Sequence, residues 1–216
     1  MINYEDQMDL FKIISKRITK DVQCYSFGGT AMMFYGYKDE TKDIDLLFER
    51  DEERKEFIRA IEDIGFSKYN LFSLYIPEKL KNKNKPLVYD NKGIRFDLFL
   101  NKIFQTSLSD KMKEDLFAVH EFREKYNLKI NVLRKEYLVM LKAVTERKSD
   151  FDDIRIIIDR EKKFDWQYLL DEVIWQHKKG NKWIILDMEK IMLELKKYIF
   201  IEKKYFDQLY KEYKKV

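Results

Sequence analysis

Two glycines and two aspartates lie close together in the run SFGGTAMMFYGYKDETKDIDLLF, residues 26–48. Gly28 and Gly29 form a turn that backbone N–H groups can use to approach an anion, because no Cβ stands in the way. Asp43 and Asp45 follow in a D-x-D pattern, and on a strand residues two apart point to the same face. Two carboxylates that close repel each other and are tolerated best around a divalent cation. The run is therefore either a phosphate loop with a metal site or a turn with a solvated acidic edge.

A third acid, Asp97, lies inside the apolar run Gly93–Leu100. Burying an acid in such a run is costly unless it is paired or bound to a metal. Three carboxylates on neighbouring strands can hold two Mg²⁺ ions, one carrying a triphosphate and one activating an attacking hydroxyl. The alternative for Asp97 is a pair with Arg95, its neighbour on the same face. The order and spacing of the three acids and the glycines favour the metal site.

The elements that position these residues follow from the spacing of apolar side chains. We expect helices over residues 3–20, 30–37 and 51–64, and strands over residues 23–27, 44–48, 71–76 and 93–100. This order of elements predicts an α+β or α/β layer that contains all three aspartates.

The pattern changes after Val132 and becomes helical. We expect helices over residues 136–146, 151–160, 165–177, 182–200 and 201–213. We therefore predict two domains, residues 1–130 and 131–216. Residues 178–216 carry 11 Lys against 6 Asp and Glu in a chain of net charge +4. This bias indicates either solvated lysine faces or a polyanionic partner.

Composition excludes several classes of protein. A chain of 216 residues with 45% hydrophobic residues can bury a core. Cys24 is the one cysteine, so no internal disulfide is possible, and His120 and His177 lie too far apart in sequence for a zinc pattern. No apolar run is long enough to span a bilayer and no signal peptide opens the chain. We expect a cytoplasmic protein with no membrane partner.

The run FGGTAMMFYGYKDETKDIDLLF resembles the signature of the nucleotidyltransferase superfamily of the DNA polymerase beta type. In that family a G-[GS] turn precedes D-x-[DE], and a third Asp lies on a later strand. The form GGTA…T-x-DID is most similar to the AbiEii-like toxin and minimal nucleotidyltransferase branches. The resemblance covers residues 22–100 and extends more weakly to residues 138–154. It implies an α+β fold, in which a small mixed β-sheet with flanking helices forms the catalytic core and a helical region follows.

The resemblance also implies a reaction and its cofactor. Asp43 and Asp45 would bind two Mg²⁺ ions, for which Mn²⁺ could substitute. Asp97 would complete the metal site and help to activate the acceptor hydroxyl. An NMP would move from an NTP, such as ATP, to that hydroxyl, and pyrophosphate would leave.

Four residues are implied in nucleotide binding. Gly28 and Gly29 would hold the phosphates, and Thr30 or backbone N–H groups would replace the serine that many family members have in place of Gly29. The position where the toxin branch often has Arg is Asp39. Lys142 would reach the triphosphate, and the alternative for it is a surface pair four residues along the helix.

The acceptor and the partners stay open at this stage. The acceptor could be RNA such as tRNA, a protein, or a small molecule. As a member of the toxin branch, the chain would act in a toxin–antitoxin system with a cognate antitoxin. A second hypothesis is a nucleotide-binding or interaction protein of the same fold without turnover. A third is a structural helical adaptor.

Overall fold

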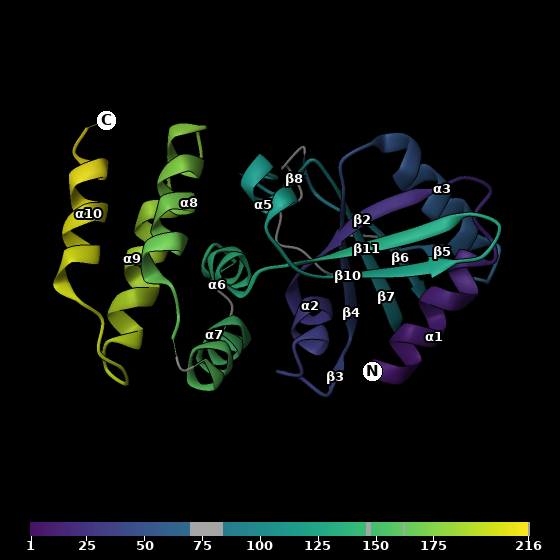
Figure 1. Cartoon of the computed structure of the whole chain (residues 1–216), viewed down its shortest axis with the longest axis horizontal. Helices are drawn as coiled ribbons and strands as arrows, with labels where there is room; N and C mark the ends of the chain where they lie inside the picture. Colours follow the sequence, from purple (N-terminus) through teal and green to yellow (C-terminus); the bar gives the residue numbers. More distant parts are fainter. Residues whose placement is uncertain (70–83, 146–147, 162, 216) are drawn as a thin grey trace. The chain divides into compact units, whose positions relative to one another are not determined.

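A computed structural model describes residues 1–69, 84–145, 148–161 and 163–215 (Figure 1). The chain divides into two compact units, Met1–Phe104 with Leu108–Leu133 and Gln105–Ser107 with Arg134–Val216. The α+β prediction is confirmed, because strands of mixed direction and flanking helices precede a helical C-terminal part. The predicted division into independent domains at residues 130 and 131 stays a prediction.

The first unit is built on one mixed sheet in the order β10-β11-β2-β4-β7-β6-β5. The bounds are β10 Leu116–Arg123, β11 Asn127–Leu133, β2 Val22–Ser26, β4 Asp43–Phe48, β7 Ile94–Leu100, β6 Leu87–Asn91 and β5 Ser67–Lys68. β11 pairs with β2 and β4 pairs with β7 in parallel, and the other neighbours on this path are antiparallel. Shorter strands are β8 Lys102–Ile103, antiparallel to β7, and β1 Ile2–Asn3, antiparallel to β3 Glu40–Thr41.

Among the helices of the first unit, α1 and α3 cover one face of this sheet. The bounds are α1 Tyr4–Ser15, α2 Gly28–Phe34, α3 Asp51–Glu62 and α5 Asp110–Glu114. Side chains from α1 and α3, such as Phe11 and Phe57, form one apolar core with Ile44, Leu46 and Phe96 of the sheet. Because side chains alternate along a strand, the opposite face of β4 carries its aspartates.

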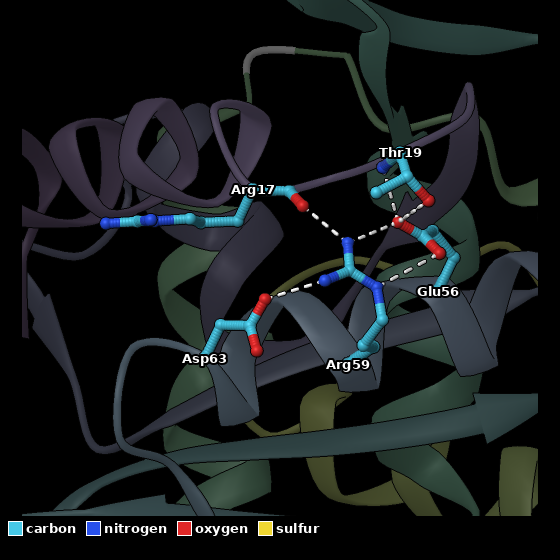
Figure 2. Close-up of polar contacts among 5 residues, drawn as sticks. All are labelled: Arg17, Thr19, Glu56, Arg59 and Asp63. Atoms are coloured by element: carbon cyan, nitrogen blue, oxygen red, sulfur yellow. Dashed lines mark hydrogen bonds and ion pairs between the residues drawn. The ribbon is translucent and has the colours of Figure 1, made fainter.

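A polar network ties the connection between α1 and β2 to α3 (Figure 2). Oε1 of Glu56 accepts hydrogen bonds from the N–H of Thr19 at 2.5 Å and from its hydroxyl at 3.1 Å. The guanidinium of Arg59 donates to Glu56 at 2.7 Å and to the carbonyl of Arg17 at 2.5 Å, and it pairs with Asp63 at 2.6 Å. Burial alone would raise the pKa of Glu56, but the bonds from Arg59 and Thr19 outweigh it and hold that pKa below its usual range.

Most predicted elements of the first unit are confirmed. The sequence predicted α3, β2, β4 and β7 close to their observed bounds, while α1 ends at Ser15 rather than at residue 20 and α2 begins two residues earlier than expected. The strand predicted over residues 71–76 lies outside the described residues. β6, β10 and β11 were not predicted, so the sheet is wider than the sequence indicated.

The second unit is helical, as predicted. The bounds of its elements are β9 Thr106–Ser107, α6 Lys135–Ala143, α7 Lys148–Arg160, α8 Trp166–Lys178, α9 Ile184–Leu195 and α10 Lys203–Tyr213. α9 is shorter than the predicted helix over residues 182–200. Trp183, directly before α9, lies outside the core, because it is 63% exposed. Among the described helices, none combines the length and the apolar character needed to cross a membrane.

Candidate active site

The register of two parallel strands brings the three aspartates onto one face. In the pairing of β4 with β7, Asp43 lies opposite Arg95 and Asp45 lies opposite Asp97. Residues opposite each other on neighbouring strands share a face, as do residues two apart on one strand. All four side chains therefore project from the face that the apolar core with α1 and α3 leaves open. The sequence predicted that the three acids share a site, and their register is consistent with that prediction.

Arg95 bridges two of these aspartates. Its guanidinium lies 2.6 Å from Oδ2 of Asp43 and 2.9 Å from Oδ1 of Asp97. A further hydrogen bond runs from Nη2 to Oδ2 of Asp97 at 3.4 Å. The Asp97 side chain is only 5% exposed, whereas Arg95 is 18% and Asp43 is 29% exposed. The pair of Asp97 with Arg95, which was the alternative to a metal site, is therefore observed. Arg95 also pairs with Asp43.

The glycine turn lies directly against Asp45. Gly28 has φ +56°, and a Cβ added to it would stand 2.2 Å from Oδ2 of Asp45. Gly29 leads into α2, and a Cβ there would stand 2.3 Å from Oγ1 of Thr41. The backbone N–H of Phe27 donates to the carbonyl of Asp45 at 3.3 Å. Only glycine permits this approach of the turn to the carboxylate, because any Cβ would overlap with it.

Thr30 joins α2 to the strand that carries the aspartates. It is fully buried, and its Oγ1 accepts a hydrogen bond from the N–H of Asp45 at 2.8 Å. Thr41 supports the same strand, because its hydroxyl donates to the carbonyl of Asp43 at 3.1 Å. These contacts fix the backbone under both carboxylates. A role of Thr30 in phosphate binding stays a prediction.

Lys142 lies in a buried ion-pair cluster of the second unit. Its ammonium contacts Oδ2 of Asp153 at 2.6 Å and Oδ1 of Asp150 at 3.3 Å. The hydroxyl of Thr145 donates to Asp150 at 2.6 Å. All three charged side chains are nearly excluded from solvent. The predicted surface pair of Lys142 involves Glu146, which lies outside the described residues, and its role at the triphosphate stays a prediction.

A cavity of the first unit lies at the other end of α2. It has a volume of about 590 Å³ and is lined by Asn3, Tyr4, Glu5, Met33, Phe34, Tyr35, Gly36, Lys38 and Asp39. Asp39, where the chain departs from the toxin branch, faces this cavity. None of the three aspartates on β4 and β7 lines it.

The carboxylates have the chemistry of a Mg²⁺ site, but one cation is already among them. Carboxylate oxygens are the ligands that Mg²⁺ prefers in proteins. Among the described residues, however, no three Asp, Glu, His or Cys side chains are grouped closely enough to hold a metal ion. The guanidinium of Arg95 makes the contacts to Asp43 and Asp97 that such an ion would make. The three carboxylates supply the oxygen ligands that Mg²⁺ prefers, and binding of Mg²⁺ here stays a prediction.

Two features of the site were not predicted from the sequence. The pair of Arg95 with Asp43 could not be read from the chain, because it depends on which strands are neighbours. The overlap that a side chain at Gly28 would make with Asp45 depends on the same register. The available signal was the alternation Arg-x-Asp in β7, which places a cation beside the third acid.

Comparison with known proteins yields likeness of structure alone. No protein-family model matches the sequence, and no curated protein matches it. A candidate nucleotidyltransferase from H. pylori superposes with a TM-score of 0.44 at 16% identity, over 98% of this chain and 95% of that one. JHP933 from Helicobacter pylori gives a TM-score of 0.44 at 15% identity, over 98% and 92% of the two chains. Neither likeness is close enough to assign an activity, so what the chain does has to be inferred from its own residues.

Proposed function

We propose that this chain is a Mg²⁺-dependent nucleotidyltransferase that moves an NMP from an NTP to a hydroxyl acceptor. The observation that carries the proposal is the register of β4 with β7. It places Asp43, Asp45 and Asp97 on one face, with the turn at Gly28 directly against one of the carboxylates. This face carries three acids, and the guanidinium of Arg95 contacts two of them, Asp43 and Asp97. An excess of carboxylates on a face without the apolar core favours a site that receives further positive charge.

Each residue has a distinct task in the proposed reaction. Asp43, Asp45 and Asp97 hold the metal ions, which neutralise charge on the attacking and leaving oxygens. Asp97 is the most buried of the three and helps to orient the acceptor hydroxyl for attack on the α-phosphorus. Gly28 lets the turn lie directly against the carboxylate of Asp45, so that the backbone of the turn would be close to phosphates held by the metal ions.

The acceptor in this proposal is RNA, with tRNA as the first molecule to test. The support is the lysine-rich C-terminal part, in which α10 exposes basic side chains and the rings of Tyr210 and Tyr213. Lysines bind phosphates and exposed aromatic rings can stack on bases. A protein hydroxyl is the alternative acceptor. Activity on tRNA would suit the toxin of a toxin–antitoxin system, with a cognate antitoxin as its partner.

A label-transfer assay tests the proposal. The purified chain is incubated with Mg²⁺, total RNA and a cell lysate, and each α-³²P-labelled NTP in turn. We expect label from one NTP to enter RNA or a protein. Asp97→Asn abolishes this transfer, while the matched control Asp9→Asn, an exposed acid on α1, retains it.

A second function has one observation in its favour. The pairing of Arg95 with Asp43 and Asp97 leaves no ready group of three ligands among the described residues, which suits a protein that binds nucleotides without turnover. Nucleotide binding without turnover is supported if no NTP transfers label and Asp97→Asn leaves NTP binding unchanged. Both results together would exclude the enzyme.

A further inference from the structure

One arginine side chain bridges two acids of the carboxylate face. Arg95 contacts two acids on different strands, and one of them, Asp97, is 95% withdrawn from solvent. An unpaired carboxylate in that position would be costly. We propose that Arg95 is the resident counter-cation of this face and that a divalent cation binds only by displacing it. The proposal rests on the proposed function in that Asp43 and Asp97 are taken as metal ligands.

The displacement follows from how closely the guanidinium approaches the oxygens. Arg95 nitrogens lie 2.6 Å from Oδ2 of Asp43 and 2.9 Å from Oδ1 of Asp97. Mg²⁺ binds carboxylate oxygens at about 2.0–2.1 Å. An ion and a guanidinium on the same oxygens would place positive charges within a few ångströms of each other, which is repulsive. The two cations therefore occupy the site in turn.

Arg95 also has a way out of the site. Its side chain is 18% exposed and Asp43 beside it is 29% exposed, so the guanidinium lies at the solvent edge of the pair. A long side chain can move its charged end into water while its stem stays packed. Asp97 cannot follow, because it lies within β7 between neighbouring strands on both sides. A cation that replaces the guanidinium would therefore meet Asp97 at the position shown here.

Without the guanidinium, divalent cations should bind more tightly. In the wild type a divalent cation must first break the charge-assisted hydrogen bonds of Arg95 with the two acids, which are stronger than hydrogen bonds between neutral groups. Arg95→Gln should therefore bind Mn²⁺ at least about tenfold more tightly than the wild type. Arg95→Lys keeps the charge but loses the forked guanidinium that reaches both acids. Its affinity for Mn²⁺ should therefore lie between that of the wild type and that of Arg95→Gln.

The experiment is a titration of the purified full chain with Mn²⁺, in which electron paramagnetic resonance measures the free ion. The matched control is Arg54→Gln, which removes an arginine of the same unit from its pair with Asp51 on α3 and should bind Mn²⁺ like the wild type. Adding Asp97→Asn to Arg95→Gln should abolish the gain. A contrary result is that folded Arg95→Gln binds Mn²⁺ no more tightly than the wild type, while Asp97→Asn weakens Mn²⁺ binding in both proteins. In that case the inference about Arg95 is wrong and the metal site is supported. If neither protein binds Mn²⁺, both the inference and the metal site are wrong.

A measurement on the wild type keeps the inference testable if Arg95→Gln does not fold. The Nε–H of Arg95 donates to Asp97, so its proton should exchange slowly with water in the cation-free protein. Saturating Mg²⁺ should make that exchange fast in nuclear magnetic resonance spectra of ¹⁵N-arginine-labelled protein. An Nε–H signal that saturation with bound Mg²⁺ leaves unchanged would show that Arg95 stays in place.

Discussion

Replacement of Gly28 by Ala tests whether the turn and the carboxylate of Asp45 are built to fit each other. The new Cβ would stand 2.2 Å from Oδ2 and 2.9 Å from Cγ of Asp45. The backbone at residue 28 also has φ +56°, in the left-handed region that side chains disfavour. The substitution therefore adds backbone strain and a clash with a proposed metal ligand.

The two effects can be estimated separately. Strain in the left-handed region costs about 1–2 kcal/mol, and the reduced freedom of the unfolded chain returns about 0.4–1 kcal/mol. Overpacking costs about 1–3 kcal/mol, and the lower end applies because the carboxylate of Asp45 can rotate away. Gly28→Ala should thus lower the free energy of unfolding by about 2 kcal/mol. For a chain of this size the midpoint temperature falls by about 4–8 °C.

Two further glycines provide matched controls. Gly36 has φ +71° with nothing within 4 Å of an added Cβ, so Gly36→Ala carries only the strain, about 1 kcal/mol. Gly29 meets Oγ1 of Thr41 at 2.3 Å with no positive φ, so Gly29→Ala carries only the overlap. Urea unfolding gives each free energy, and Mn²⁺ titration shows whether the rotated Asp45 weakens cation binding. This account of the turn is refuted if Gly28→Ala lowers the free energy of unfolding no more than Gly36→Ala does and leaves Mn²⁺ binding unchanged.

Three other predictions follow from buried polar groups. Glu56→Gln should lower the free energy of unfolding by about 1.5 kcal/mol at pH 7. Because the pKa of folded Glu56 is lowered, this difference is fully present above about pH 4.3 and disappears as the pH falls through that pKa, which pH-dependent urea unfolding measures. Lys142→Met leaves buried acids without their cation and should cost about 3–5 kcal/mol by thermal unfolding, whereas Lys197→Met, at a site 61% exposed, should stay within about 0.5 kcal/mol. Burial raises the pKa of the Cys24 thiol, so Ellman's reagent should leave native protein unmodified at pH 8 and modify one thiol per chain in urea; a fast reaction of native protein would contradict its burial.

The elements that the sequence predicted well have strong local signals. The compact apolar run of β4 and the charged, periodic run of α3 ending before Gly65 are examples. β10 could not be found in this way, because Phe117 and Val119 on it are exposed and its burial alternates only weakly. An exposed strand lacks the buried stripe that periodicity detects.

The site was predictable as a set of residues but not as an arrangement. D-x-D and the later Asp97 are visible in the chain, since pleating alone orients residues two apart. The position of Arg95 between Asp43 and Asp97 depends on the parallel pairing of β4 with β7, and no local pattern encodes which strands pair. The burial of Lys142 was missed for a related reason, because its partners lie on the following helix and neutralise it there.

The parallel pairing of β11 with β2 has a consequence for how the protein is made. Residues 22–26 emerge early from the ribosome, but their neighbours at residues 128–132 are synthesised much later. Until then one edge of β2 has unpaired N–H and C=O groups that other chains could bind. The edge of β4 that pairs with β7 is likewise unpaired until residues 94–100 have been synthesised. The carboxylate face forms only after most of the first unit has been translated. A nascent or truncated chain ending before residue 127 should therefore be inert and prone to aggregation, so the activity proposed for this fold cannot begin before its sheet is complete.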